Sequence, residues 1–278
     1  MHLVPFLAIL TLAMSSSAQP PPDAPMDINT VLMRSTFRIE GGGTLGTVFI
    51  MGAPDPSVPG QAHFILITAT HVLSGIPGDS AVLHLRRKRG HAFERLLLQL
   101  PIRQKGQPLW VAHAEVDVSV MRVQLPAEAD LPLASTDLLA TDEILMSLEI
   151  RPGDTLVALG FPYGAESNDA GFPILRSARI SSYPILPTAA TKLLLLDFPV
   201  FPGNSGGPVY LYAENRVMRG ATNIGTSQCI VGVVSEERTL EERVVGIDQV
   251  TIKKHKLGLA NVVHASFVRE LVGRLTAH

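Results

Sequence analysis

The chain has 278 residues, of which 46% are hydrophobic and 17% are charged, and its formal net charge is -2. This composition is that of a globular protein, and the near-neutral charge argues against nucleic acid as a partner. The single cysteine, Cys229, excludes an intramolecular disulfide. The length suits one large domain or two modest ones.

The first residues are typical of an export signal. An apolar run from Leu3 to Met14 is followed by small residues that end at Ala18. The run is too short to span a bilayer, which needs about 20 residues. We therefore expect a signal peptide over residues 1–18, a Pro-rich leader over residues 19–29 and no membrane partner after cleavage; a buried N-terminal helix is the alternative. An exported protein without disulfides suits a bacterial periplasm or exterior.

From residue 30 onward the predicted elements are mainly β-strands. Short apolar or alternating runs, broken by glycine and proline, recur along the chain. These runs are 35–51, 62–73, 80–100, 116–125, 154–161, 174–183, 192–198, 206–212, 229–235 and 257–264. Their number and spacing predict an all-β sandwich or barrel, and the run 80–100 predicts a hairpin with a basic tip.

Three other segments have a different character. Residues 126–153 are rich in Pro, Ala and acidic residues and predict a connection between two β units, with a boundary near 130–145. The charged stretch 235–256 predicts a solvated excursion between two strands. The last segment predicts a C-terminal α-helix, because its apolar residues recur at helical spacing. These residues are Phe267, Val268, Leu271, Val272 and Leu275.

The stretch FPGNSGGPVYLY, residues 201–212, places a serine among glycines. Gly203 on one side of Ser205, and Gly206 and Gly207 on the other, permit backbone conformations that a side chain would forbid. Backbone N–H groups can then turn toward a ligand. Nucleophilic catalysis at neutral pH needs a serine, a base beside it and a group that orients the base. Ser205 is therefore the candidate nucleophile.

His71 and Asp117 are the candidates for the other two groups. His71 follows the apolar run FILITAT, and a strand of this kind would hold its imidazole rigidly at the edge of a cleft. Asp117 begins an alternating aliphatic strand, where a buried carboxylate is costly unless its charge is used. Beside a histidine it would accept the Nδ1–H bond and fix the tautomer. Taken alone, each residue also has an ordinary structural explanation that is equally good. His71 can be a histidine in a turn, and Asp117 can be a surface aspartate on an edge strand.

Together the motifs LITATHVL, DVSVM and GNSGGPV, in this order, resemble the trypsin-like serine proteases. ALGFPYG before ILRSARIS is similar to the bacterial HtrA (DegP-like) group. The resemblance covers roughly residues 30–275. It implies an all-β fold of two six-stranded antiparallel β-barrels, at residues 30–135 and 136–278, with a C-terminal α-helix. The first barrel would carry His71 and Asp117, and the second would carry Ser205.

The resemblance also implies the chemistry of a serine endopeptidase. Ser205 is the nucleophile, His71 the general base and then acid, and Asp117 the orienting carboxylate. The backbone N–H groups of Gly203 and Ser205 form the oxyanion hole. A protein or peptide substrate is implied, with no cofactor, no metal and no nucleic acid, and the oligomeric state stays open. We expect no C-terminal PDZ domain of the kind that the HtrA group often carries.

Two positions depart from the family pattern. Asn204 stands where many animal members have an aspartate that pairs with a freed N-terminus, so activation by that route is not expected. Pro199 stands where the trypsin subgroup has the carboxylate that binds Arg or Lys, so an aliphatic or small P1 side chain is expected instead. The predicted walls of the P1 pocket are Val233, Val234, Gly258 and Ala260.

Two alternatives remain open. GNSGG also fits the G-x-S-x-G elbow of α/β-hydrolases, which would give a secreted esterase with Ser205, Asp248 and His264. That elbow needs a helix directly after the serine, whereas GGPVYLY favours a strand. The other alternative is an inactive protease-like binding module, because a blocked cleft or a flipped oxyanion hole leaves no signal in the sequence.

Overall fold

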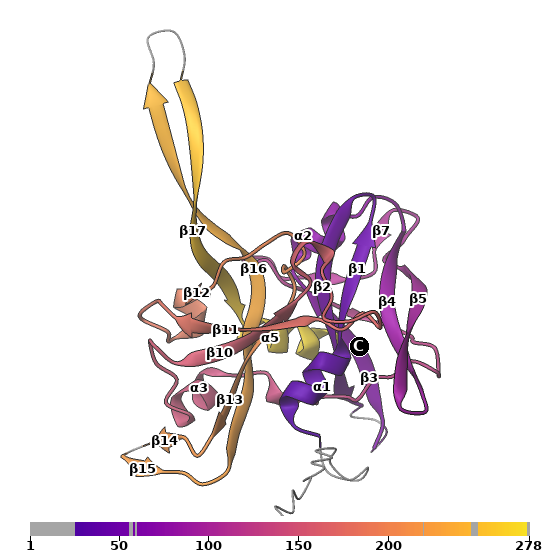
Figure 1. The fold of residues 1–278 in the computed structure, drawn as a ribbon, viewed down its shortest axis with the longest axis horizontal. Coiled ribbons are helices and arrows are strands. Elements are labelled where there is room, and N and C mark those ends of the chain that lie inside the picture. The colour runs from indigo at the N-terminus through magenta and orange to yellow at the C-terminus, as the bar shows by residue number, and fades with distance from the viewer. Residues whose placement is uncertain (1–25, 56–57, 59, 219, 246–249, 277–278) are drawn as a thin grey trace, which may run out of the picture.

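The computed structural model describes residues 26–276 except 56–57, 59, 219 and 246–249, and it forms two β-rich halves that stand side by side (Figure 1). The first half contains α1 (Ile28–Ser35), β1 (Thr36–Gly41), β2 (Thr44–Pro54), β3 (Ala62–Thr68), α2 (Thr70–Gly75), β4 (Ser80–Arg89), β5 (Ala92–Pro101), β6 (Arg103–Gln104), β7 (Gln107–Pro108), β8 (Val111–Ala112) and β9 (Ser119–Arg122). Two short helices follow, η1 (Thr136–Leu138) and α3 (Asp142–Ser147). The second half contains β10 (Thr155–Gly160), η2 (Pro162–Gly164), β11 (Ile174–Ile180), α4 (Thr188–Thr191), β12 (Leu193–Asp197), β13 (Pro208–Glu214), β14 (Val217–Met218), β15 (Ala221–Thr222), β16 (Thr226–Val245), β17 (Val250–His264) and α5 (Ala265–Thr276).

The first half is built on one antiparallel sheet of seven strands, in the order β5-β4-β1-β2-β3-β9-β8. Strand β2 is buried on both faces: Val48 and Ile50 point into the core of the first half, and Phe49 and Met51 into a cluster between the halves. This division follows from the two-residue period of a strand. The sheet has seven strands and not the predicted six, because the two-residue strand β8 pairs with β9 at its edge.

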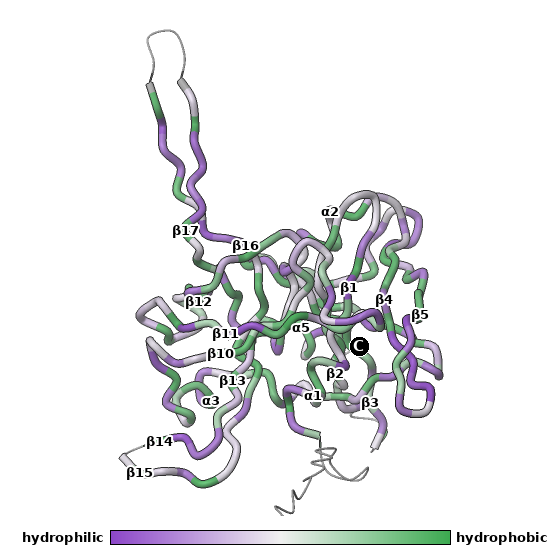
Figure 2. The backbone as a smooth tube through the Cα atoms, viewed as in Figure 1, coloured by the Kyte–Doolittle hydropathy of each residue, from purple (hydrophilic) through white to green (hydrophobic). Residues whose placement is uncertain are grey.

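The second half is a closed barrel of six strands, in the order β10-β11-β12-β17-β16-β13. Its interior is filled by an apolar cluster that includes Leu156, Leu194 and Val231. Beyond the barrel, β16 and β17 continue as a long two-stranded ribbon, which is largely hydrophilic (Figures 1 and 2). The predicted excursion over residues 235–256 is therefore itself β-structure. The predicted all-β class, with a closed six-stranded barrel and a terminal helix, is confirmed.

A third apolar cluster lies between the halves and is covered by helices from both ends of the chain. Ile28 and Leu32 of α1, and Phe267 and Leu271 of α5, are buried in it. The apolar stripe predicted for the C-terminal helix is thus confirmed. No helix among the described residues has the length and apolar character needed to cross a membrane.

Helix α1 begins inside the segment predicted as the end of the leader. The side chain of Asp27 caps the helix by accepting the backbone N–H of Thr30 at 3.1 Å. Ile28 and Leu32 are one helical turn apart and bury their side chains in the cluster between the halves, which stabilises the helix. The predicted signal peptide and the leader up to residue 25 lie outside the described residues, so export stays a prediction.

The buried side chain of Arg86 on β4 joins the two halves. Its guanidinium donates to the carbonyl oxygen of Gly171 in the second half at 2.6 Å and to that of Thr36, directly after α1, at 2.8 Å. It lies between the rings of Phe37 and Phe172, at 4.4 Å and 4.3 Å from their centroids. Burial lowers the pKa of Arg86 to about 9. One side chain thus fixes a strand, the end of a helix and a loop of the opposite half.

Candidate active site

His71 and Asp117 lie together at the edge of the first half. His71 is in α2, directly after β3, whose residues Ile65 to Thr68 are fully buried and fix its position. Its Nδ1 lies 2.6 Å from Oδ2 of Asp117, and its backbone N–H donates to Oδ1 of the same carboxylate at 3.0 Å. The carboxylate therefore holds both the ring and the backbone of His71. This is the pairing that the motifs predicted.

Ser235 is a residue of this site that the sequence analysis missed. It lies on β16 in the second half, and its Oγ donates to Oδ2 of Asp117 at 2.7 Å. The hydrogen bond crosses the seam between the halves and leaves the carboxylate with partners on both sides. The only signal in the sequence is a serine directly after the apolar run 229–234.

The turn that carries Ser205 is fixed to the same strand. The backbone N–H of Gly206 donates to the carbonyl of Val234 at 2.7 Å, and the N–H of Val234 donates to the carbonyl of Gly207 at 2.9 Å. Val234 directly precedes Ser235. The serine turn and the hydrogen bond to Asp117 are therefore attached to consecutive residues of β16.

The first half approaches the serine turn just as closely. The backbone N–H of Thr47 donates to the carbonyl of Ser205 at 2.8 Å. A Cβ added to Gly206, whose φ is +89°, would lie 2.1 Å from Oγ1 of Thr68 and 3.1 Å from the backbone nitrogen of Ala69. These residues lead directly into His71. The structure therefore brings Ser205, His71 and Asp117 to one place on the seam.

The turn before Ser205 presents two free N–H groups. The N–H of Asn204 donates to the carbonyl of Phe201 at 3.0 Å, and Gly203 at the third position has a φ of +96°. Proline at the second position and glycine at the third are typical of a type II turn. A Cβ on Gly203 would lie 2.1 Å from the carbonyl oxygen of Phe161, so only glycine fits. Within the described part of the chain, the N–H groups of Gly203 and Ser205 donate to no protein acceptor.

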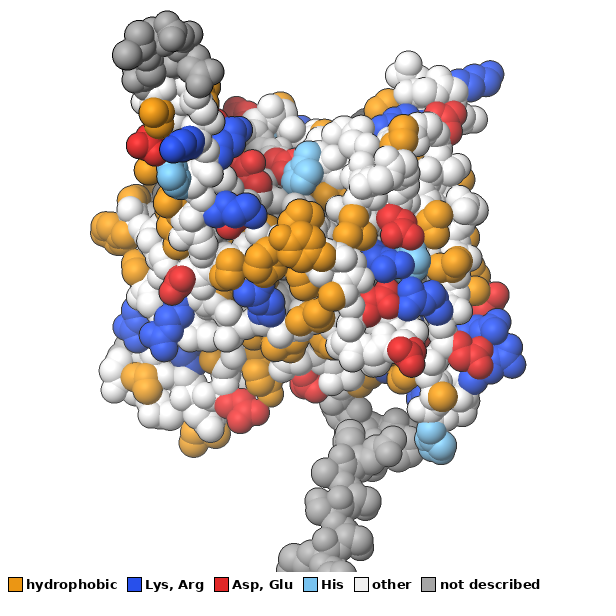
Figure 3. Space-filling view, turned by 45° about the horizontal axis from the view of Figure 1, so that its top comes forward, with side chains coloured by type: hydrophobic (Ala, Val, Ile, Leu, Met, Phe, Trp, Pro, Cys, Tyr) orange, Lys and Arg blue, Asp and Glu red, His pale blue; other side chains and the backbone are white. Residues whose placement is uncertain are grey.

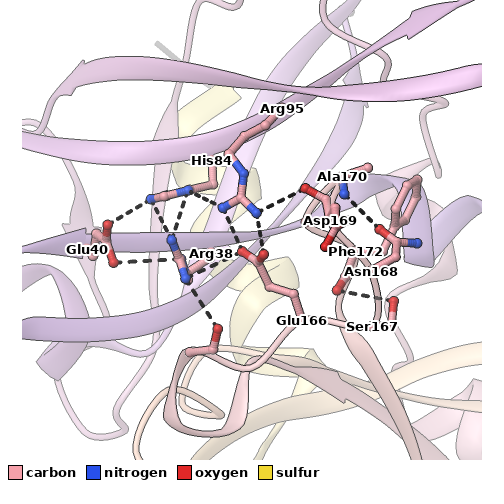
Figure 4. A network of polar contacts seen from close by, with 12 residues as sticks. Arg38, Glu40, His84, Arg95, Glu166, Ser167, Asn168, Asp169, Ala170 and Phe172 are labelled. Atoms are coloured by element: carbon pink, nitrogen blue, oxygen red, sulfur yellow. Dashed lines mark hydrogen bonds and ion pairs between the residues drawn. The ribbon is translucent and has the colours of Figure 1, made fainter.

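A polar network supports this turn from the side. The N–H of Tyr163 donates to the carbonyl of Pro202 at 2.6 Å, so the loop after β10 contacts the turn directly. Glu166 in the same loop forms ion pairs with Arg38 and Arg95 of the first half (Figure 4). The network therefore ties the loop, and through it the turn, to strands β1 and β5.

Charge around His71 favours its protonated form. The hydrogen bond that His71 donates to Asp117 raises the pKa of His71, and burial opposes this. The negative charges of Asp117 and Glu236 raise the pKa further, so that it lies above its ordinary value. Burial alone would raise the pKa of Asp117, but the hydrogen bonds from His71 and Ser235 outweigh it and lower the pKa. An imidazole whose Nδ1–H is held by a fixed carboxylate is suited to proton transfer at its other nitrogen.

The esterase alternative does not agree with the fold. Ser205 is followed by strand β13 and not by the helix that a nucleophile elbow requires. His264 is buried, lies 3.2 Å from Oγ1 of Thr191, and has a pKa lowered to about 4 by burial. Asp248 lies outside the described residues.

The single cysteine, Cys229, is buried, as expected for a small apolar residue. Burial raises the pKa of its thiol to about 12.

The predicted walls of the P1 pocket are wrong for three residues. Val233, Val234 and Ala260 are fully buried in the apolar clusters and contribute no surface to a pocket. Gly258 has a φ of +69°, and its carbonyl accepts the N–H of Phe198 at 3.1 Å. Successive side chains of strands β16 and β17 point to opposite faces, and an apolar cluster covers each face, so these side chains are buried. Composition alone does not reveal this.

In this structure two β-rich halves meet at a histidine–aspartate pair and a glycine-flanked serine. This is the arrangement of a peptidase. The sequence matches the model of the trypsin-like peptidase domain over residues 46–218, a stretch that includes all three residues. The chain therefore belongs to the family of trypsin-like peptidases. The match does not distinguish the HtrA group within that family. No curated protein matches the sequence.

Several solved structures are similar at low sequence identity. Rv3671c from M. tuberculosis, in an inactive form, is 19% identical with a TM-score of 0.45, over 92% of this chain and 97% of that one. The thermostable serine protease AL20 from an extremophilic microorganism is 11% identical with a TM-score of 0.47, over 88% and 98% of the two chains. The protease Anisep from Arthrobacter nicotinovorans is 12% identical with a TM-score of 0.46, over 89% and 98%.

The pKa of His71 sets an expected pH dependence. A general base must be neutral, so kcat/KM should fall as the pH drops through a pKa above the ordinary 6.5 of histidine. The Glu236→Gln variant removes a negative charge that favours the imidazolium, and the acidic limb of the profile should move to lower pH. The control is Glu214→Gln. Glu214 lies at the end of β13 that is farther from the serine turn, so its substitution should leave the acidic limb of the pH profile in place. A limb that stays or moves upward in Glu236→Gln would contradict the assignment.

The network around Glu166 gives a second expected result. Glu166→Gln keeps the size of the side chain but removes both ion pairs, so the loop that supports Pro202 loosens. Small misplacement of catalytic groups is costly, and we expect kcat to fall about tenfold with little change in KM. Steady-state kinetics on a peptide substrate measures the split. The matched control is Glu94→Gln, which removes exposed ion pairs with Arg87 and Arg89. Equal kcat and KM in the two variants would rule out a positioning role for Glu166.

Proposed function

We propose that the protein is a serine-type endopeptidase that acts through an acyl-enzyme on Ser205. The observation that carries this proposal is the 2.6 Å contact of His71 with Asp117, beside the glycine-rich turn of Ser205. A hydroxyl becomes an effective nucleophile when a neighbouring base takes its proton, and the base is effective when a carboxylate fixes its tautomer.

The reaction runs in two halves. In the first, Oγ of Ser205 attacks the scissile carbonyl, His71 takes the hydroxyl proton, and the imidazolium then gives this proton to the departing amine. In the second, His71 takes a proton from water, the resulting hydroxide attacks the acyl carbon, and Ser205 recovers its proton. Asp117 keeps the Nδ1–H of His71 directed to itself, so that Nε2 is the nitrogen that exchanges the proton with Ser205.

The charge that forms on the carbonyl oxygen needs donors that are already in position. The N–H groups of Gly203 and Ser205 supply them in this proposal, which the turn geometry supports because both groups are free of protein acceptors within the described residues. Removal of one such donor typically costs 10²–10³-fold in kcat. The support that the turn receives from Tyr163 and Thr47 limits its movement before substrate arrives.

The test is covalent labelling of the purified mature protein with a fluorophosphonate probe, with the modified residue located by peptide mass spectrometry. Wild type should be labelled at Ser205, and both Ser205→Ala and His71→Ala should lose the label. A well-folded wild type that is not labelled would overturn the proposal and favour a protease-like module that binds without cleaving. Label at another serine would overturn the assignment of the nucleophile.

A further inference from the structure

Arg176 on β11 lies beside the segment 198–202, which leads from β12 into the turn that presents the two free N–H groups. Its Nη1 donates to the carbonyl of Pro199 at 2.9 Å. Its guanidinium carbon lies 4.5 Å from the centroid of the Phe198 ring and 5.6 Å from that of Phe201. One side chain of the barrel therefore contacts this segment at three of its residues.

The segment 198–202 is irregular and is held by few hydrogen bonds. At its start, the N–H of Phe198 donates to a carbonyl of β17 at 3.1 Å. At its end, the N–H of Tyr163 donates to the carbonyl of Pro202 at 2.6 Å. Between these two anchors, within the described structure, the hydrogen bond from Arg176 is the one that ties the backbone of the segment to another element.

The contacts of Arg176 go beyond those of an ordinary surface arginine. Such a residue covers apolar surface with its aliphatic stem while its charge stays in water. Arg176 is partly buried, and burial lowers its pKa. Among the residues that the structure describes, no carboxylate pairs with it. A cation that loses water without an ionic partner needs another form of compensation, and here the two ring faces and a carbonyl oxygen supply it.

The segment sets the direction of one oxyanion donor. The N–H of Gly203 belongs to the same planar peptide group as the carbonyl of Pro202, which Tyr163 holds. This peptide group can turn only if the residue before it moves. That residue is Phe201, whose ring contacts Arg176 and also the ring of Tyr163, with 5.3 Å between the two ring centroids. The guanidinium therefore restricts the motion that would turn the N–H away.

We propose that Arg176 is a positioning residue of the peptidase site, whose guanidinium fixes the segment 198–202 so that the N–H of Gly203 stays directed at the substrate oxygen. The proposal rests on the proposed function of Ser205. Arg176 contacts neither the substrate nor the reacting atoms, so its effect passes through the backbone. The substrate oxygen gains its negative charge only during the attack, so a misdirected donor lowers kcat and leaves KM nearly unchanged.

The contact is accessible to small solutes. Figure 3 shows hydrophobic side chains gathered near the middle of the face that it displays, with a basic side chain at their edge. Tyr163, whose ring contacts Phe201, is 69% exposed, and Phe201 and Arg176 are only partly buried. A free guanidinium ion can therefore enter the space that is left when the side chain of Arg176 is truncated.

The test measures the rate of fluorophosphonate labelling of Ser205, and kcat and KM on a peptide substrate, in Arg176→Ala. The phosphonyl oxygen takes the place of the substrate oxygen, so labelling depends on the same donors. We expect the labelling rate and kcat to fall about 10²-fold, the cost of a small misplacement, with little change in KM. Guanidinium chloride, far below the concentration that unfolds the protein, should restore much of the loss, and sodium chloride at equal concentration should not.

Three further variants separate the guanidinium from the bulk of the side chain. Arg176→Met keeps an apolar chain against the rings, so it should melt close to wild type, lose kcat and show no rescue, because its side chain occupies the space that guanidinium would enter. Arg176→Lys keeps the charge without the planar group and should have an intermediate rate. Arg179→Ala, an exposed arginine on the same strand, is the matched control and should behave as wild type.

Three results would overturn the proposal. The first is a wild-type labelling rate and kcat in Arg176→Met. The second is a loss in Arg176→Ala that guanidinium does not reduce, which would assign the effect to altered packing. The third is an equal loss in Arg179→Ala. Failure of the proposed function is seen separately, because the wild-type protein would then not be labelled at Ser205, and the role of Arg176 would fall with it.

Discussion

Replacement of Ser205 by alanine is expected to lower kcat by about 10⁶-fold, the scale found when a catalytic serine is removed from such a triad. The substitution deletes only Oγ, so His71 has no hydroxyl to deprotonate and no acyl-enzyme can form. The backbone contacts of this residue remain, including the N–H of Thr47 that donates to its carbonyl at 2.8 Å. A residual rate about 10³–10⁴ above that in water should persist from the oxyanion donors and substrate binding.

The measurement pairs steady-state kinetics with thermal melting of the same preparations. Ser74→Ala, an exposed serine in α2 three residues after His71, is the control and should retain wild-type kinetics. The Ser205→Ala variant should melt close to wild type, because no apolar contact is lost. A much lower melting temperature would assign Ser205 a structural role and weaken the proposed mechanism.

The Asp117→Asn variant is expected to lose about 10⁴-fold in kcat, as for the same change in the trypsin-like triad. Asn has the shape of Asp, but its amide can donate to Nδ1 of His71. The histidine would then carry its proton on Nε2 and could not accept one from Ser205. The hydrogen bond that His71 donates to Asp117 is also the largest cause of the raised pKa of His71, so the acidic limb of the residual activity should move to lower pH.

Full kcat/KM profiles against pH, compared with wild type and Asp137→Asn, would check this expectation. Asp137 lies in the connection between the halves with an exposed side chain, so its substitution should leave the profile unchanged. Near wild-type kcat in Asp117→Asn would mean that the carboxylate does not select the tautomer. A loss of kcat with an acidic limb that stays at the wild-type pH would mean that Asp117 acts on the position of His71 and not on its charge.

The parts of the site that lie in short motifs were predictable from the sequence. His71, Asp117 and Ser205 each occupy a motif whose neighbours also have a clear role, such as the buried strand before His71 and the glycines around Ser205. Ser235 was not predictable in this way, because its role depends on a hydrogen bond across the seam to a residue 118 positions earlier. A serine after an apolar strand has many possible partners, and only the assembled halves select one.

The fold shows the same division between local and non-local information. Alternation identified the strands of both halves, since it depends on residues two positions apart. The helix α1 was missed because its two buried residues, Ile28 and Leu32, become core only when the second half covers them. The ribbon of β16 and β17 beyond the barrel was expected to be a solvated excursion, and its charge supports that. Its β-structure comes from pairing between the two strands as far as Val245 opposite Val250, which the mixture of charges of both signs conceals.

The contacts of α1 have a consequence for synthesis of the chain. Asn29 in α1 accepts a hydrogen bond from Tyr210, a residue 181 positions later, at 2.9 Å. At roughly 5–20 residues per second, on the order of ten to forty seconds separate the emergence of these two residues from the ribosome. For most of that interval the first half lacks the carbonyl of Gly171 that accepts from Arg86, and throughout it lacks the contact of Tyr210 with α1. The site on the seam between the halves therefore cannot be assembled in the nascent chain before Tyr210 has emerged.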